Sequence, residues 1–130
     1  MIGMSGLRVL FVDDEEELVS AVVERLQLRG IEARGATAGA DALRLVEREL
    51  FDVVVADVKM PGLGGLEVVR HIKALHPGLQ VILLSGHNSQ TDAKEGRRLG
   101  AFDYVEKPID IEILIDILRN AAAATEQGDR

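Results

Sequence analysis

The chain has 130 residues, of which 47% are hydrophobic and only 3% aromatic, a composition that suits one domain with an aliphatic core. Its formal net charge of −7, from 15 basic and 22 acidic residues, argues against direct binding to nucleic acid, which needs a basic face. The sequence has no cysteine, no apolar run of membrane-spanning length and no signal-peptide pattern at its start, which excludes disulfides and thiolate metal sites and favours a cytoplasmic protein with no membrane partner.

Apolar runs alternate with amphipathic stretches along the chain. Residues 7–12 predict a buried strand, and residues 15–29 predict a helix that ends at Gly30. The same alternation then predicts strands over 31–36, 51–56, 81–84 and 102–105, and helices over 41–49, 65–76, 91–99 and 109 to about 124.

The apolar face of each predicted helix marks the expected core. In the first three helices these faces carry Leu18, Val22 and Leu26, then Ala42, Leu45 and Val46, then Leu66, Val69 and Ile72. The stretch 109–118 alternates like a half-buried strand, but it follows Pro108 and runs on into four alanines, which favours a helix. Its buried stripe would be Ile111, Leu114, Ile115 and Leu118. Ile113 and Ile117 fall outside that stripe.

Five repeats of strand and helix predict an α/β protein. Three of the strands are almost continuously apolar, as expected when helices cover both faces of a parallel sheet. We therefore expect a doubly wound, five-stranded parallel sheet in a three-layer (βα)5 sandwich of flavodoxin-like shape. The expected divisions are a flexible N-terminus at 1–6, one domain at 7–124 and a polar C-terminal tail at 125–130.

Reactive side chains follow four of the predicted strands at their carboxyl ends, where open α/β sheets form their sites. They are Asp13 and Asp14, Asp57, Ser85 with Gly86, and Lys107. Three neighbouring carboxylates repel one another, and a hard divalent cation such as Mg2+ relieves that repulsion. Asp57 can then act as a nucleophile that forms an acyl phosphate, while Lys107 and Ser85 pair the remaining phosphoryl oxygens.

Each of these residues also has an ordinary structural explanation. Asp13 or Ser85 could cap a helix, and Lys107 could be a solvated charge. The glutamates at 15–17 are interpreted only as acidic residues that suit a helix N-terminus. The joint occurrence of the other groups at four strand ends favours a common site. Because neither GxxxxGK[ST] nor GxGxxG occurs, the phosphoryl donor must arrive on another molecule.

The sequence resembles the receiver domain of two-component response regulators. The resemblance rests on VDDEEE at 12–17, DVKMPGLGG at 57–65, LLSGH at 83–87 and LGAFDYVEKP at 99–108. It covers about residues 7–122, nearly the whole chain. It implies a signalling switch that takes a phosphoryl group from a histidine kinase or a phosphotransfer protein and catalyses only its own phosphorylation and dephosphorylation.

The resemblance implies a phosphoacceptor and a metal site. Asp57 is the expected acceptor of the phosphoryl group. Mg2+, or Mn2+, is expected to bind Asp14, Asp57 and the backbone carbonyl of Lys59, with Asp13 acting mainly through water.

The resemblance also implies a set of phosphate-binding and switch residues. Lys107 is expected to pair with the phosphoryl group, and its bond to Pro108 is a candidate cis peptide. Ser85 stands at the position of the family's switch hydroxyl and Tyr104 at that of its switch aromatic residue. Gly86 stands where alanine is frequent in the family, and it leaves room for the incoming group.

Two further pairs of residues are interpreted as tuning and readout positions. Lys59 and His87 flank the expected phosphate and are candidates for setting its lifetime. The readout surface is expected on helix 91–99, strand 102–105 and the last helix. There Ile113 and Ile117 would contact an effector or a second copy of the chain, unless the buried face of the helix is wider than predicted.

Two alternatives remain open. A Mg2+-dependent phosphatase of the haloacid-dehalogenase kind also uses a strand-end aspartate, but it needs a second aspartate two residues later, where this chain has Lys59. A binding module of the same shape that is never phosphorylated is the other alternative. The complete set of three aspartates and Lys107 argues against it.

Overall fold

The computed structural model describes residues 6–86 and 90–128. Within these ranges the strands and helices alternate. The elements are β1 (Arg8–Val12), α1 (Glu16–Leu28), β2 (Glu32–Ala36), α2 (Gly39–Arg48), β3 (Val53–Asp57), α3 (Gly65–Leu75), β4 (Gln80–Ser85), α4 (Gln90–Leu99), β5 (Asp103–Glu106) and α5 (Ile111–Gly128). No helix in the described ranges is long and apolar enough to span a bilayer.

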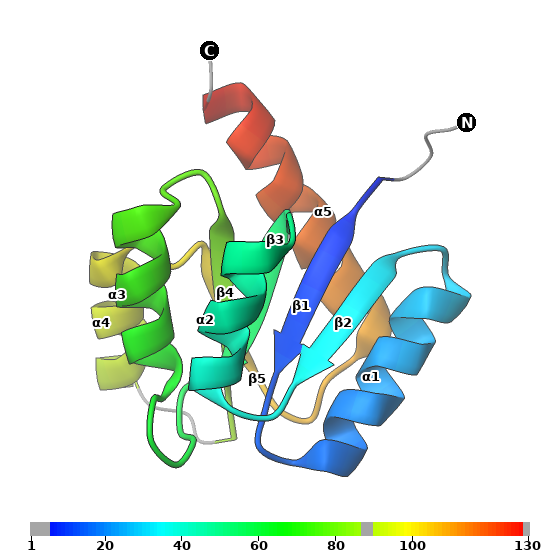
Figure 1. The fold of residues 1–130 in the computed structure, drawn as a ribbon, viewed down its shortest axis with the longest axis horizontal. Coiled ribbons are helices and arrows are strands. Elements are labelled where there is room, and N and C mark those ends of the chain that lie inside the picture. The colour runs from blue at the N-terminus through cyan, green and yellow to red at the C-terminus, as the bar shows by residue number, and fades with distance from the viewer. Residues whose placement is uncertain (1–5, 87–89, 129–130) are drawn as a thin grey trace.

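The five strands form one parallel sheet in the order β2-β1-β3-β4-β5. Helices α1 and α5 pack on one face of the sheet, and α2, α3 and α4 lie on the other (Figure 1). The expected doubly wound, three-layer α/β sandwich is therefore confirmed.

Two apolar cores, one beneath each helical layer, hold the sheet between the helices. Residues of β1 serve the two cores in turn: Val9 and Phe11 join the core under α1 and α5, whereas Leu10 and Val12 join the core under α2 and α3. Full burial of each such side chain stabilises the fold by about 1.5–3 kcal/mol. The central strand β3 is buried on both faces in the same way, and this burial sets where its last residue, Asp57, emerges.

The start of α5 shows how a side chain sets a helix boundary. The carboxylate of Asp110 accepts hydrogen bonds from the N–H groups of Glu112, at 3.0 Å, and Ile113, at 3.1 Å. Asp110 is thus the residue that caps the helix, which begins at Ile111 rather than at residue 109 as expected. The helix continues to Gly128, beyond the expected end near residue 124.

The start of β3 also differs from the expected one. Phe51 and Asp52 were expected in the strand, which instead begins at Val53. The N–H of Asp52 donates to the carbonyl of Arg8, and the carboxylate of Asp52 accepts the N–H of Arg8, both at 2.8 Å. These two hydrogen bonds hold the approach to the strand. The flexible N-terminus expected at 1–6 stays a prediction, because residues 1–5 lie outside the described ranges, whereas residues 125–128 of the expected polar tail belong to α5.

The exposure of α5 differs in part from the expected stripe. Leu114, Ile115 and Leu118 are buried as predicted, and Ile113 is 56% exposed. The prediction that Ile117 is exposed is wrong, because this side chain is half-buried against the core shared with α1. The apolar face of the helix is therefore wider than the four-residue stripe, and only Ile113 remains as an exposed isoleucine of the pair.

Candidate acidic site at the carboxyl edge of the sheet

The end of β1 places two aspartates side by side with different environments. Asp13 is completely buried, and its N–H donates to the carbonyl of Ala36 at 3.1 Å. One of its carboxylate oxygens accepts the N–H of Glu15 at 2.9 Å. Asp14, the next residue, is exposed at the surface.

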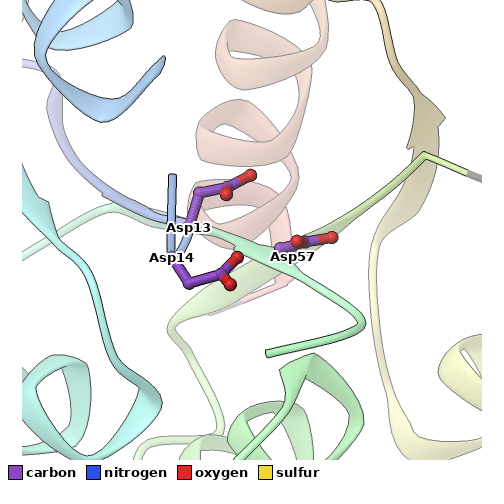
Figure 2. A group of neighbouring side chains, drawn as sticks. All are labelled: Asp13, Asp14 and Asp57. Atoms are coloured by element: carbon purple, nitrogen blue, oxygen red, sulfur yellow. The ribbon is translucent and has the colours of Figure 1, made fainter. Parts of the chain in front are cut away.

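Asp57 is the last residue of β3 and lies beside the pair that follows β1. It is paired in the sheet with Leu84 of β4 and is only 7% exposed. One carboxylate oxygen from each of Asp13, Asp14 and Asp57 lies within 4.8 Å of the other two. The three carboxyl groups project to the same side from the ends of β1 and β3 (Figure 2). In the described part of the chain, this is the one cluster of acids and histidines with the spacing of a metal site.

The loop after Asp57 folds tightly back against the end of β3. The N–H of Gly65 donates to the carbonyl of Val58 at 3.0 Å. A Cβ atom on Gly65 would lie 2.5 Å from the carbonyl oxygen of Asp57, and one on Gly64 would lie 2.5 Å from that of Val58. The glycines at these positions therefore permit an approach of backbone to backbone that any side chain would block.

Lys107 brings a positive charge to the three aspartates. Its ammonium Nζ lies 2.8 Å from Asp13 Oδ2, 3.0 Å from Glu15 Oε1 and 3.6 Å from Asp57 Oδ2. The backbone holds it there, because the N–H of Lys107 donates to the carbonyl of Ser85 at 2.8 Å. Its bond to Pro108 is cis, as the resemblance implied. Burial alone would lower the pKa of Lys107, but the contacts with Asp13 and Glu15 raise it on balance.

The surroundings of Asp57 disfavour the charged form of its carboxyl group. Burial raises the pKa of Asp57, and so do the charges of Asp13 and Asp14. Lys107 and a hydrogen bond from the backbone of Lys59 act in the opposite direction without cancelling the rise. Asp57 thus holds its proton more tightly than an ordinary aspartate, chiefly because it is buried.

Of the remaining predicted site residues, Lys59, Ser85 and Gly86 border one hollow and Tyr104 does not. A hollow of about 340 Å³ is lined by Asp14, Glu15, Asp57, Lys59, Ser85, Gly86 and Lys107. Ser85, at the end of β4, is 3% exposed, whereas Lys59 and Gly86 are exposed. Tyr104 does not line this hollow; it is half-buried against the core under α2 and α3. His87 lies outside the described residues.

Glu15 is a contact residue that sequence reasoning missed. It was interpreted as one of three acids that suit the start of a helix. It does precede α1, but its side chain caps no backbone group and instead meets Lys107. The run of three glutamates gave no signal of which one would reach across 92 residues to the lysine.

The donor set fits a hard divalent cation. The candidate ligands, Asp13, Asp14 and Asp57, offer only oxygen atoms, the type that Mg2+ prefers. Asp13 Oδ2 is buried and accepts no hydrogen bond of good geometry, although it pairs with Lys107. The spacing and the chemistry of the three carboxylates are therefore those of a site for a hard cation.

The sequence and the fold of the chain match those of known proteins. The family model described as the response regulator receiver domain matches residues 9–119. The transcriptional regulatory protein GlrR of Escherichia coli is 33% identical over 123 residues, which are 92% of this chain and 28% of GlrR. The chain therefore spans just over a quarter of the length of this curated relative.

Solved structures share the fold over nearly the whole chain. A CheY-like receiver domain protein of Methanospirillum hungatei has a TM-score of 0.89 at 25% identity, and the match covers 94% of this chain and 98% of that one. A response regulator of Burkholderia pseudomallei, solved with a phosphorylated aspartic acid, a calcium ion and citrate, has a TM-score of 0.82 at 25% identity. That match covers 95% of this chain and 72% of the other.

Proposed function

The chain belongs to the response regulator receiver domain family of two-component systems, and from this premise we propose that Asp57 accepts a phosphoryl group from a phosphohistidine on a kinase or phosphotransfer protein. The observation that carries the proposal is the position of Asp57. Its carboxylate borders a hollow at the carboxyl edge of the sheet, 3.6 Å from the ammonium of Lys107 and beside Asp13 and Asp14.

The proposed transfer exchanges one phosphoryl bond for another. A carboxylate oxygen of Asp57 attacks the phosphorus, the P–N bond breaks, and the imidazole leaves with the electron pair of that bond. Lys107 pairs with one phosphoryl oxygen, and the hydroxyl of Ser85 donates to a second. Later attack by water on the phosphorus breaks its bond to Asp57, which releases inorganic phosphate and restores the carboxylate.

We propose that Asp14, Asp57 and the backbone carbonyl of Lys59 hold Mg2+ or Mn2+, with Asp13 acting through water. When bound, the cation supplies the positive charge that the carboxylates and the phosphoryl oxygens need. The spacing of the three carboxylates and the raised pKa of Asp57 support this assignment.

The proposed output is a shift of an existing conformational equilibrium. A phosphoryl dianion on Asp57 draws the hydroxyl of Ser85 toward it, which moves the end of β4 and the segment that leads to α4. Tyr104 of β5, half-buried against the core under α2 and α3, changes its packing in response. The surface of α4, β5 and α5 then presents a changed face to an effector domain, a partner or a second copy of the chain.

Ile113 is the proposed apolar contact on that surface, because it is the large side chain of α5 that is 56% exposed. Ile117, half-buried beneath the helix, can contribute only at its edge. Replacing Ile113 by glutamate is expected to weaken partner binding or dimerisation of the phosphorylated chain. Sedimentation and pull-down results equal to those of the wild type would remove Ile113 from the interface.

The lifetime of the acyl phosphate is proposed to depend on Lys59 and His87. Lys59 is exposed at the border of the hollow, where its side chain can alter the access of water to the phosphoryl group. Decay of the phosphorylated chain should therefore change in Lys59→Ala and in His87→Ala. Equal decay rates in the wild type and both variants would contradict this role.

In this proposal the chain is a switch rather than an enzyme with an external substrate, and the only reactions it catalyses are its own phosphorylation and dephosphorylation. Its proposed location is the cytoplasm, which contains the ATP that a histidine kinase uses. The net charge of −7 supports the view that any DNA contact belongs to an output domain or partner, and not to this chain.

Incubation with Mg2+ and acetyl phosphate tests the proposed function. The intact mass should rise by one phosphoryl group in the wild type and in Asp116→Asn, a control at an exposed position of α5, but not in Asp57→Asn. An unmodified wild type would favour the binding module that is never phosphorylated. Repeated turnover of a phosphomonoester such as p-nitrophenyl phosphate would instead favour the phosphatase.

A further inference from the structure

Lys107 forms an ion pair with Glu15, a residue that has no part in the proposed phosphoryl transfer. Its ammonium is closer to Asp13, at 2.8 Å, and to Glu15, at 3.0 Å, than to Asp57, at 3.6 Å. The two shorter contacts are within hydrogen-bond distance, and they hold the ammonium beyond that distance from Asp57. Movement of the ammonium toward a phosphoryl group on Asp57 therefore works against these two shorter contacts.

The two closer partners differ in how they tolerate separation from the lysine. The side chain of Asp13 is fully buried, and a charge left there without a partner cannot be solvated by water. The side chain of Glu15 is 63% exposed, so water replaces the ammonium at little cost. Glu15 is thus the contact that Lys107 gives up more readily.

The backbone of Glu15 is held in place independently of its side chain. Its N–H donates to the carboxylate of Asp13 at 2.9 Å, and its carbonyl accepts the N–H of Val19 at 3.0 Å. Because the side chain makes no capping hydrogen bond to α1, it can leave Lys107 without disturbing the start of the helix.

The Glu15–Lys107 pair also separates two hollows of the surface. The first is the hollow at Asp57, and the second, also about 340 Å³, is lined by Glu15, Leu18, Val22, Arg25, Lys107, Pro108, Ile109 and Ile111. Glu15 and Lys107 are the two residues that line both hollows. The ion pair therefore forms part of the boundary between the acidic site and a largely apolar depression between α1 and the segment that precedes α5.

We propose that Glu15 is a positioning residue that retains Lys107 at this boundary until a phosphoryl group on Asp57 takes the ammonium from it. The inference rests on the proposed function of Asp57. Release of Glu15 opens the boundary between the two hollows, which links the state of Asp57 to the surface of α1. The glutamate lowers the affinity of the site for a phosphoryl group and makes the exchange of partners by Lys107 part of activation.

Binding of beryllium fluoride, an analogue of the phosphoryl group, tests this role at saturating Mg2+. Glu15→Gln should bind the analogue about two- to fivefold more tightly than the wild type, the range expected for loss of a partly exposed ion pair. Glu17→Gln removes the same charge from an exposed position in the first turn of α1 and should leave the dissociation constant unchanged. Calorimetry gives the constants, and circular dichroism checks that each variant is folded.

A double-mutant cycle separates positioning from the general field of a negative charge. In a Lys107→Gln background, Glu15→Gln should have no further effect, because the residue through which it acts is gone. Tighter binding in that background as well would overturn the proposal, and so would equal binding by wild type and Glu15→Gln. Failure of the wild type itself to bind the analogue would instead contradict the proposed function of Asp57.

Discussion

Asp57 combines two properties that oppose each other in a folded protein: it is nearly buried, and it lies beside two other carboxylates. Both properties raise its pKa. For an acid with a raised folded-state pKa, the stability contribution is greatest below its ordinary pKa and is lost as pH rises through the folded pKa. The same residue that makes the site reactive therefore makes the Mg2+-free chain less stable at neutral pH.

Asp57→Asn should raise the free energy of unfolding at pH 7 by about 1 kcal/mol in the absence of Mg2+, the ordinary scale of a single substitution. The gain should shrink as the pH falls toward 4, because the raised pKa lets the folded wild type take up this proton more readily than the unfolded chain does. Urea titrations at both pH values measure it, with Asp116→Asn as the control that shows no gain. A gain of equal size at both pH values would contradict the electrostatic explanation. Added Mg2+ should shrink the gain at pH 7, because it stabilises the wild type more.

Replacement by alanine is expected to change stability in different ways at two glycines near the site, Gly65 and Gly86. In Gly65→Ala the new Cβ would lie 2.5 Å from a backbone oxygen of Asp57, which should lower the free energy of unfolding by about 1–3 kcal/mol. In Gly86→Ala the nearest atom would be Lys107 Cδ at 3.9 Å, an ordinary contact. This variant should be unchanged or up to about 1 kcal/mol more stable. Denaturant midpoints decide, and a stable Gly65→Ala would contradict the close approach.

For single residues, the sequence does not determine which side chains contact one another. Asp13, Asp14, Asp57 and Lys107 could be placed at strand ends because the backbone positions them. Glu15 could not, since three consecutive glutamates differ only in the direction that α1 gives each side chain. A residue whose contact depends on rotation about a helix axis needs the folded structure.

At the scale of elements, caps and glycines set the boundaries that periodicity places only approximately. The first predicted helix ended at Gly30, and the structure has Gly30 with a positive φ of 82° just after α1. The start of α5 was misplaced because the alternating apolar residues from 109 obscured the capping aspartate at 110. The same alternation made the buried face of this helix look narrower than it is, and Ile117 was assigned to the wrong side.

Asp110→Ala should lower the free energy of unfolding by about 1 kcal/mol, since it removes the acceptor of two N–H groups at the start of α5. Asp116→Ala, at an exposed position within the same helix, should change it by no more than a few tenths of a kcal/mol. Thermal and urea unfolding of the two variants give the comparison. Equal losses in both variants would show that the cap does not hold the helix start.

At the scale of the whole molecule, the order of the strands places the site. The chain turns in opposite directions from β1 and β3, and open α/β sheets bind their ligands at such a reversal. The continuous apolar runs indicated that helices cover both faces of β1, β3 and β4, and these strands are almost completely buried at the three inner positions of the sheet. The weakly apolar β2, EARGA, and the half-buried β5 lie at the two edges. The order itself depends on helix packing across the sheet, which one sequence does not show.

The central claim is that this fold delivers one aspartate, Asp57, as the phosphoryl acceptor. The chain phosphorylated with acetyl phosphate and Mg2+ can be reduced with borohydride, which converts an aspartyl phosphate into homoserine and marks the modified position permanently. Peptide mass spectrometry should find homoserine at position 57 and nowhere else. Homoserine at position 13 or 14, or a phosphoryl group that survives on the chain without any reduction product, would contradict the account.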